Sequence, residues 1–399
     1  MTDAILVINC GSSSVKFALL AAQALHARLW SGAVERIGLP DGRMHAHDAG
    51  GAERDTRCDI ANHEAALGLI LDAVEKRVPV PRLLAVGHRV VHGGPDCDCP
   101  ALLTDNLEDR LRGLIPLAPL HQPHNLAGIA AARRVRPELP QVVCFDTAFH
   151  HRLPRMAQLT GLPRAFADEG IRRYGFHGLS YEYIVDALRR DGVDVDRERI
   201  IVAHLGNGAS LCAIREGRSV DTSLGFSTLA GLPMGTRCGD LDPGIVLHLL
   251  GDKGMSLERL QYMLYHESGL LGMSGISRNM QDLLDRPAEP AAVEAVDYFC
   301  YQTRRQIAAL TAALGGLDRL VFTGGIGANS SAVRAKICAG LDYLGVALDS
   351  ERNKGDARTI SADSGTVAID AYPTDEEWMI ARHVHQILAT RSSEKGISA

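Results

Sequence analysis

The strongest constraint on the fold of this chain is the alternation of short apolar runs with longer segments of helical periodicity. Each apolar run has the length of a strand and is closed by Gly, His, Asp or Asn. This alternation predicts α/β architecture, with functional side chains at the carboxyl ends of the strands. The apolar runs are 4–8, 83–92, 141–146, 199–206 and 319–325, and the helical segments are Glu64–Lys76, Asn125–Arg136, Tyr181–Arg190 and Ala291–Leu314.

The chain is long enough for two domains and carries a weak internal repeat. Its 399 residues exceed the length that a single hydrophobic core usually serves. The segments that begin at Ile5 and at Ile200 share one outline, an apolar strand, a glycine-containing turn and a second apolar strand. They superpose without a gap at an offset of 195 residues. The repeat predicts two related halves, each opening with a hairpin whose turn faces a shared cleft.

Composition excludes several classes of partner. A net charge of −6 argues against nucleic acid and against an anionic membrane surface. The first ten residues lack the features of a signal peptide, and no apolar run approaches the ~20 residues that cross a bilayer. We therefore expect a cytoplasmic protein whose nine cysteines are reduced thiols. Cys97 and Cys99 lack a second pair with zinc spacing, so no metal site is predicted there.

The segment NCGSSSVKFAL, residues 9–19, follows the first apolar run. A tight Gly/Ser turn exposes backbone N–H groups and hydroxyls that converge on one anion, and Lys16 adds a positive charge. It is not a Walker loop, because Lys16 does not follow a second glycine and no helix start is evident. From this segment alone, a phosphate cradle and a solvated hairpin with a serine-rich tip are equally good interpretations.

Other segments place charged or imidazole groups next to glycines or at the ends of apolar runs. Taken singly, each has an ordinary structural explanation, such as a surface ion pair or a packed histidine. Taken together, they predict a site that handles several negative charges. Phosphoryl transfer from a nucleotide fits, because its catalysis is mostly positioning and charge stabilisation. These groups are Arg89, His121, His124, Asp146, His177, Arg237, the glycine-rich turn 323–330, and Glu376 with Glu377 at the start of the final helix.

The order and spacing of seven blocks resemble the acetate kinase family, part of the sugar kinase, Hsp70 and actin superfamily. The blocks are NCGSSSVK, GHRVVHGG, FDTAFH, YGFHG, HLGNG, MGTRCGDLDPG and TGGIG, and with the acidic segment at Glu376–Glu377 they span nearly the whole chain. The resemblance implies an α/β fold with two duplicated ribonuclease-H-like domains (actin/Hsp70/sugar kinase type) around a central cleft. It implies a first domain of residues 1–150 plus about 378–399. The second domain, 151–377, would hold the nucleotide site and the dimer surface.

The same resemblance implies an activity and its ligands. The reaction is reversible, direct in-line phosphoryl transfer from ATP to acetate, giving acetyl phosphate and ADP, with Mg²⁺ or, in its place, Mn²⁺. The implied partners are a nucleotide, a small carboxylic acid and a second copy of the chain. The implied metal-binding residues are Asn9 and Glu376, and the implied catalytic residues are Arg89, His121, Asp146, His177 and Arg237. The implied acyl-site residues are Arg89, Val91, Leu120, Phe176 and Thr228. The implied nucleotide-site residues are Ser12, Ser14, Lys16, His204, Leu205, Gly206, Asn207, Gly208, Asn279, Met280, Gln281, Gly325, Ile326, Gly327, Ala328 and Asn329.

The chemistry of the acceptor questions one of these roles. A carboxylic acid has a pKa near 4–5 by analogy with Asp and Glu, so acetate is already ionised at neutral pH. A general base would have no proton to remove. Our hypothesis is that Asp146 orients Arg89 or Arg237 and balances the arginine charge. His177 and Arg237 would then stabilise the planar phosphoryl group.

The sequence also departs from the family pattern. Thr228 occupies a position where the family usually has a proline in the acyl pocket wall, and Ala328 one where Glu is common. Asn279 and Gln281 stand where Asp and Arg are common on the adenine side. One methylene is worth only ~1–3 kcal/mol of discrimination, so propionate is a plausible second substrate. The preference for a nucleotide base is equally open.

Three other functions compete with acetate phosphorylation. A propionate or butyrate kinase of the same family differs in the acyl chain that it favours. A regulatory or chaperone-like ATPase on the same fold would form no acyl phosphate and would leave Arg89, Asp146, His177 and Arg237 without a purpose. A sugar kinase needs an aspartate base for a neutral hydroxyl, whereas paired arginines favour an anionic acceptor.

Overall fold

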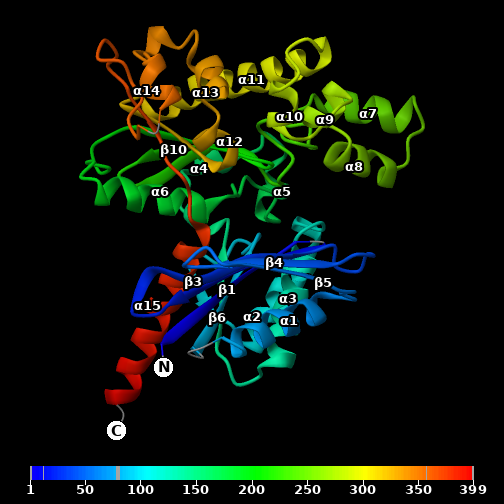
Figure 1. Ribbon diagram of the computed structural model, residues 1–399. Coiled ribbons are helices and arrows are strands. Elements are labelled where there is room, and N and C mark those ends of the chain that lie inside the picture. The colour runs from blue at the N-terminus through cyan, green and yellow to red at the C-terminus, as the bar shows by residue number, and fades with distance from the viewer. Residues whose placement is uncertain (1, 12, 78–80, 356, 398–399) are drawn as a thin grey trace. The chain divides into compact units, whose positions relative to one another are not determined.

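The computed structural model describes residues 2–11, 13–77, 81–355 and 357–397. The chain divides into two compact units, one formed by residues 1–151 with 375–399 and the other by residues 152–374 (Figure 1). The chain thus returns to the first unit at Asp375, three residues before the expected position. As a result, Glu376 belongs to the same unit as Arg89.

The first unit is built on a mixed sheet that, over the described residues, has eight strands in the order β5-β4-β3-β2-β1-β6-β8-β7. Strands β1, β2 and β3 run antiparallel, whereas β6 and β8 continue the sheet parallel to β1. The strands are β1 Asp3–Cys10, β2 Ser14–Ala21, β3 Ala24–Glu35, β4 Arg43–Asp48, β5 Glu53–Arg57, β6 Arg82–Val90, β7 Ala101–Leu102 and β8 Gln141–Phe145. The helices are α1 His63–Glu75, α2 Asp105–Gly113, α3 Gln122–Val135 and α15 Glu376–Ile397, with short 3₁₀ turns at Ile115–Leu117 and Ala148–His150.

The second unit repeats the central topology of the first. Its sheet has the order β11-β10-β9-β12-β13, in which β9, β10 and β11 run antiparallel and β12 and β13 continue parallel to β9. This order matches β3-β2-β1-β6-β8, so the predicted duplication is confirmed. The strands are β9 Ile200–Leu205, β10 Ala209–Arg215, β11 Arg218–Thr222, β12 Arg319–Thr323 and β13 Ala368–Ala371. The helices are α4 Arg155–Gln158, α5 Arg164–Asp168, α6 Gly178–Arg190, α7 Pro243–Gly251, α8 Leu257–His266, α9 Gly269–Ser274, α10 Met280–Leu284, α11 Pro290–Leu314, α12 Gly324–Asn329, α13 Ser331–Cys338 and α14 Ser350–Lys354, with a 3₁₀ turn at Asp342–Leu344.

The two opening hairpins keep the predicted offset but differ in their turns. Strands β1 and β9 end, and β2 and β10 begin, at positions 195 residues apart. In the first hairpin Cys10 pairs with Val15, whereas in the second Leu205 pairs with Ala209. The turn of the first hairpin is therefore one residue longer, which gives it an additional backbone N–H.

Successive side chains of β1 point to opposite faces of the first sheet, and helices cover both faces. Leu6 and Ile8 are buried in one cluster with residues of α1 and α3, such as Ile70. On the other face a Cβ at Gly87 would meet the side chains of Ile380 and Val384 in α15, which Figure 1 draws in red beside the strands. The C-terminal helix thus completes the core of the first unit.

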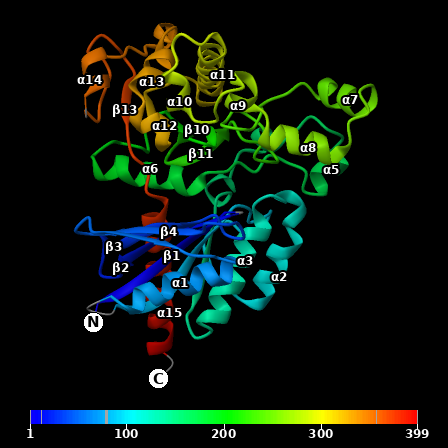
Figure 2. The ribbon, with the colours of Figure 1, turned by 45° about the vertical axis from the view of Figure 1, so that its right-hand side comes forward.

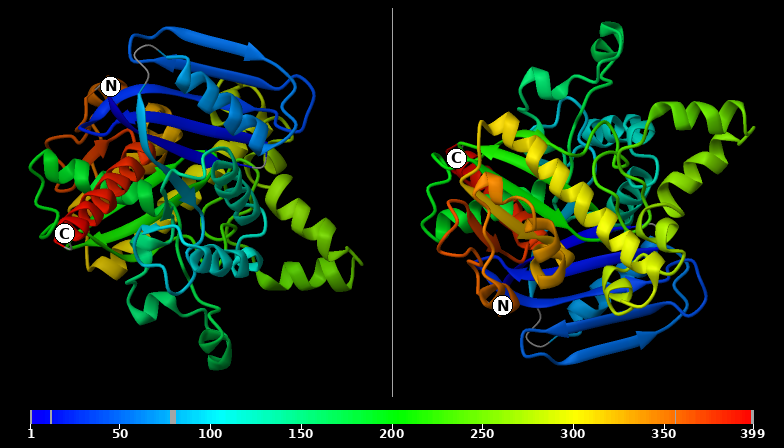
Figure 3. Two further views of the ribbon diagram at one scale, coloured as in Figure 1. Left: turned by 90° about the horizontal axis from the view of Figure 1, so that it is seen from below. Right: turned by 90° about the horizontal axis from the view of Figure 1, so that it is seen from above.

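The second sheet is enclosed in the same way. Helix α11 packs against β10, β11 and β9, and α6 packs against β9. Figure 2 shows β10 and β11 between α6 and α11, and the right-hand view of Figure 3 shows the long helix α11 lying across the strands.

Some predicted element boundaries shift in the structure. Helix α3 starts at Gln122, three residues before the predicted start, since Pro123 is compatible with the first turn of a helix. The final helix begins at Glu376 as predicted. Across the described part of the chain, no helix is both long and apolar enough to span a bilayer.

Candidate active site

Arg89 is the centre of a charged cluster in the first unit. It lies at the end of β6, and Asp146 directly follows the parallel strand β8. Arg89 Nε donates to Asp146 Oδ1 at 2.9 Å, and Nη2 donates to Oδ2 at 2.7 Å. The third nitrogen, Nη1, lies 2.9 Å from Oε2 of Glu376 at the start of α15. One guanidinium is therefore held by two carboxylates that are distant from it in the sequence.

The cluster is nearly closed to solvent. The side chain of Arg89 is 17% exposed and that of Asp146 only 3%. Burial by itself lowers the pKa of Arg89, but the charges of Asp146 and Glu376 outweigh it and raise that pKa well above its ordinary value. Arg89 is therefore always charged, and the fork geometry fixes its direction. This geometry supports the hypothesis that Asp146 orients Arg89.

The Gly/Ser turn connects β1 to β2 in the same unit. Gly11 N donates to the carbonyl of Ser14 at 2.8 Å, and Asn9 pairs with Lys16 across the hairpin. Ser12 lies outside the described residues. The turn leads into a strand, which confirms that this segment is not a Walker loop. An imidazole nitrogen of His63, the first residue of α1, lies 2.8 Å from the carbonyl of Gly11, a contact that sequence reasoning missed.

Asn125 is a second residue that sequence reasoning missed. Its side chain in α3 is buried and spans two segments of the predicted site. The Oδ1 atom accepts from the backbone N–H of Val91 at 3.0 Å, and Nδ2 donates to the carbonyl of Cys10 at 3.0 Å. Asn125 thus ties the end of β1, next to Asn9, to the chain that follows Arg89. One amide can do this because it offers both an acceptor and donors.

The remaining predicted residues of the first unit lie on the loops around α3. Val91 is almost buried, directly after β6, and Leu120 is half-buried before α3. His121 is the residue that precedes the first turn of α3, and its side chain makes no capping bond to that helix.

In the second unit, His177 and His204 form a stacked pair. The ring centroids are 4.4 Å apart, and the planes are inclined by 22°. His177 Nδ1 is 2.8 Å from the hydroxyl of Ser210, and His204 Nδ1 is 2.8 Å from the hydroxyl of Ser180. Each imidazole is thus tied at its Nδ1 atom by a buried serine.

Arg237 lies in the loop between β11 and α7 with Thr228. Arg237 Nη1 donates to the carbonyl of Thr228 at 3.2 Å. A Cβ at Gly269, where φ is +61°, would come within 2.6 Å of the carbonyls of Met234 and Arg237, so the loop packs against backbone that only glycine allows. Phe176, another predicted acyl-site residue, is fully buried in this unit.

The predicted nucleotide segments of the second unit converge. Strands β9 and β12 are parallel neighbours, so the turn 204–208 and helix α12 emerge at the same edge of the sheet. A Cβ at Gly235 would lie 3.1 Å from the carbonyl of Arg278 and 3.4 Å from Asn207 Oδ1, which brings the start of α10 to this edge as well. Asn279 caps α10 by accepting from Gln281 N at 2.9 Å, and the Met280 side chain is buried.

A buried arginine supports the glycine-rich turn from behind. Arg334 in α13 is 4% exposed, and Nη1 donates to the carbonyls of Gly327 and Ala328 at 2.9 and 2.7 Å. Its Nε and Nη2 donate to Oδ1 and the carbonyl of Asn353. Burial lowers the pKa of Arg334. Uncharged oxygen atoms therefore hold the guanidinium of Arg334 beside residues 325–329.

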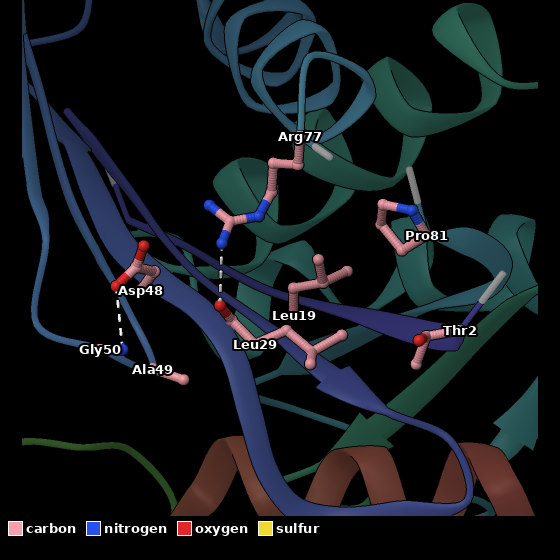
Figure 4. A pocket seen from close by; sticks show the side chains of 8 residues that line it. All are labelled: Thr2, Leu19, Leu29, Asp48, Ala49, Gly50, Arg77 and Pro81. Atoms are coloured by element: carbon pink, nitrogen blue, oxygen red, sulfur yellow. Dashed lines mark hydrogen bonds between the residues drawn. The ribbon is translucent and has the colours of Figure 1, made fainter. Parts of the chain in front are cut away.

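Two further features bear on where ligands could bind. Within the described ranges, no group of three or more His, Cys, Asp or Glu side chains is arranged to hold a metal ion. A cavity of about 300 Å³ in the first unit is lined by none of the predicted site residues (Figure 4). In this cavity Arg77 donates to the carbonyl of Leu29 at 3.2 Å, and Asp48 accepts from Gly50 N at 2.9 Å, so both charged groups are already engaged.

Comparison with known proteins identifies the family of this chain. The model of the acetokinase family matches residues 4–382. The chain belongs to the acetokinase family. An acetate kinase of Rhodopseudomonas palustris is 47% identical over 395 residues, which cover 97% of this chain and 99% of the relative.

Two solved structures agree with the fold. An acetate kinase of Porphyromonas gingivalis has a TM-score of 0.88 and 38% identity, covering 97% of this chain and 100% of that chain. A propionate kinase of Francisella tularensis has a TM-score of 0.91 and 34% identity, covering 96% of this chain and 98% of that chain.

The sequence did contain a signal for two site residues that were not predicted, Ser180 and Tyr181. Ser180 and Tyr181 follow His177 by three and four residues, so a helix that starts beside His177 places them one turn away from it. Arg334 and Asn353 carried no such signal, because their contacts depend on how α13 and α14 fold back on α12.

Proposed function

We propose that this protein transfers the γ-phosphoryl group of ATP to acetate, reversibly and directly, giving acetyl phosphate and ADP. The observation that carries the proposal is Arg89, a guanidinium at the end of β6 that is held by Asp146, after β8, and by Glu376, at the start of α15. An anionic acceptor needs a fixed cation, because it must approach a phosphate that is itself negative. Membership of the acetokinase family over residues 4–382 supports this choice.

Arg89 has one edge that suits an acceptor carboxylate. Asp146 engages Nε and Nη2, whereas Nη1 lies 2.9 Å from Oε2 of Glu376. A substrate carboxylate would take Nη1 in exchange with Glu376. Asp146 then orients and balances Arg89, and no general base is required, since the acceptor is already ionised.

The second unit supplies the groups for the nucleotide and the moving phosphoryl group. The turn 204–208 and helix α12 offer backbone N–H groups at one sheet edge, as phosphates require. His177 and Arg237 are the donors proposed for the charge that spreads over the planar phosphoryl group.

We also propose that the nucleotide binds with Mg²⁺, for which Mn²⁺ would substitute. Mg²⁺ prefers oxygen donors and is usually held by one or two carboxylates together with substrate phosphates. Glu376 and Asn9 fit, since both offer side-chain oxygens in the first unit. Burial, and next the charge of Glu376, raise the pKa of the neighbouring Glu377. The metal would neutralise phosphate charge during transfer.

Propionate is the second candidate substrate. Thr228 replaces the expected proline. It lies in the same loop as Arg237, which donates a hydrogen bond to the Thr228 carbonyl. A propionate kinase is among the structures similar to this chain. One additional methylene changes binding by only ~1–3 kcal/mol, so both acids are expected to react at different rates.

The deciding experiment is a hydroxamate assay for acyl phosphate with ATP, Mg²⁺ and acetate, propionate or butyrate. We expect the highest kcat/KM with acetate. Arg89→Met should abolish the signal, whereas Arg82→Met, on an exposed arginine of the same strand, should not. ATP hydrolysis without acyl hydroxamate from any acid would instead support a regulatory ATPase.

We further propose that the protein acts as a cytoplasmic homodimer. None of the residues of α7 is buried, although this helix is almost wholly apolar, and Leu247 is 71% exposed. A second copy of the chain would cover this surface. Light scattering should give twice the mass of 42.9 kDa, and Leu247→Glu should halve it, whereas a monomeric wild type would refute the dimer.

A further inference from the structure

Two buried hydroxyl groups, linked by a hydrogen bond, lie behind the imidazole of His177. His177 Nδ1 is 2.8 Å from Ser210 Oγ, and the hydroxyl of Tyr181 is hydrogen-bonded to the same oxygen. Tyr181 and Ser210 are fully buried. Tyr181 comes from α6 and Ser210 from β10, so a helix and a strand of the sheet that it covers meet at one hydroxyl.

The contacts of the His177 ring show which nitrogen faces Ser210 and which faces the glycine turn. His177 has φ +60° and ψ 25°, a left-handed conformation, and stands immediately before α6. Its Nδ1 points to Ser210, whereas a Cβ at Gly208 would come within 3.0 Å of Nε2. The Nε2 atom therefore borders the glycine turn that is proposed to hold phosphates, and any side chain at position 208 would crowd it.

The direction of one hydrogen bond among Tyr181, Ser210 and His177 determines the direction of the other. Ser210 has one hydrogen and two partners, so it can donate to only one of them. Tyr181 keeps its proton at neutral pH, since burial raises the pKa of its hydroxyl. If Tyr181 donates to Ser210, the serine hydrogen turns to His177 Nδ1. Both hydroxyl hydrogens are then used in hydrogen bonds, and Nδ1 of His177 must be an unprotonated acceptor.

The stacked neighbour favours a neutral ring at His177. His204 lies 4.4 Å away, centroid to centroid, and is the direct cross-strand partner of Ser210. Two adjacent imidazolium groups would repel each other. A neutral His177 carries a single ring proton, and if Nδ1 accepts from Ser210, that proton is on Nε2.

We propose that Tyr181 and Ser210 are positioning residues that hold the proton of His177 on Nε2, so that this nitrogen donates a hydrogen bond to the phosphoryl group during transfer. This assignment rests on the proposed function for its purpose, but not for the proton arrangement itself. No proton moves in the transfer step, because Tyr181 and Ser210 act only by fixing the tautomer of His177.

The direct test is ¹⁵N NMR of the full-length protein with ¹⁵N-labelled histidine, at neutral pH and without ligands. The His177 signals are assigned by their loss in His177→Gln. We expect Nδ1 in the range of an unprotonated nitrogen and Nε2 in that of a protonated one. A protonated Nδ1, in either the other tautomer or an imidazolium, would overturn the proposal, and this measurement needs no variant at Tyr181 or Ser210.

Variants test the catalytic consequence. Tyr181→Phe should lower kcat by about 3- to 10-fold, with the KM values for ATP and acetate unchanged. Ser210→Ala should lower it more, towards the 10²–10³ that follows loss of a direct donor. Tyr183→Phe on the same helix, where Arg190 lies over the ring, is the matched control and should be neutral. The conservative Ser210→Thr should restore part of the loss.

The outcomes separate this inference from the proposed function. Unchanged kcat and an unchanged tautomer in both Tyr181→Phe and Ser210→Ala would refute the positioning role. A wild type that shows the expected tautomer but forms no acyl phosphate would refute the proposed function and leave the proton arrangement standing.

Discussion

Arg89 and Asp146 are joined through two parallel N–H···O bonds at the ends of neighbouring strands, 57 residues apart in the sequence. This fork fixes both the direction of the guanidinium and the ionised state of the pair. In the proposed reaction, which has no proton to remove, we expect the carboxylate to act by holding Arg89.

Asp146→Asn should cut turnover without adding an ionisation to the pH–rate profile. The amide can bond Arg89 but no longer balances its charge, so we expect kcat to fall by at least about tenfold, about 1.4 kcal/mol. The measurement is kcat between pH 5.5 and 9. Asp105→Asn, at a side chain that is 91% exposed, is the control. Loss of a basic limb in the Asp146→Asn profile would contradict the orienting role.

Arg334→Met should weaken nucleotide binding more than acetate binding. The change leaves the carbonyls of Gly327 and Ala328 without their donor, and hydrogen bonds to charged groups are worth ≈ 1.5–3 kcal/mol. We expect the KM for ATP to rise by about tenfold or more, and Arg334→Lys to recover part of it. Arg352→Met, on a partly exposed neighbour, should have little effect. An equal rise in both KM values would contradict a specific role of Arg334 at the nucleotide site.

Thr228→Ala should shift the acyl preference towards propionate. Shortening the side chain removes about one methyl group and a hydroxyl from the proposed pocket wall, and a methylene is worth ~1–3 kcal/mol in such a pocket. We expect the ratio of kcat/KM for propionate to that for acetate to rise by up to about tenfold. Ser227→Ala serves as the comparison. A ratio that does not move would remove Thr228 from the acyl site.

His88 should make the protein less stable in mild acid. Burial lowers its pKa from the ordinary 6.5 to about 4. The amide of Gln141, oriented with its nitrogen 2.7 Å from His88 Nε2, donates to the neutral ring. Above pH 6.5 the folded and unfolded states both hold His88 neutral.

Between pH 6.5 and 4 only the unfolded chain binds a proton at this residue. The free energy of unfolding should therefore fall by up to about 3 kcal/mol over this range. Urea unfolding at a series of pH values should show a shallower decline for His88→Gln than for the wild type. Parallel curves for the two proteins would contradict the expectation.

Local patterns predicted much of the fold. The apolar runs became β1, β6, β8, β9 and β12, because strand length and apolar content are readable in short windows. The glycine-rich turns at the ends of these strands were also predicted, since glycine marks close backbone approaches. The one-residue difference between the two hairpin turns was not, because register depends on the pairing of two strands.

The site was also predicted in part, with some residues identified from the sequence and others found only in the structure. Sequence blocks identified Arg89, Asp146 and His177 as candidates and suggested Asp146 as a partner of Arg89 or Arg237, but not the contact of His177 with Ser210. Glu376 was expected as a metal ligand, which stays a prediction, and the structure shows an ion pair with Arg89, 287 residues earlier in the chain, that was not expected. Ser210 and Asn125 were missed because their roles arise only where β10 meets α6 and where α3 meets β1.

The sequence by itself determined the element types, the duplication and the residues that can hold charge, because periodicity and turn chemistry are local properties of the chain. Only the tertiary structure decided which charge faces which, since parallel strand order and helix packing bring residues together across large sequence separations. The direction of the Arg89 fork and the hydroxyls behind His177 are results of that long-range packing.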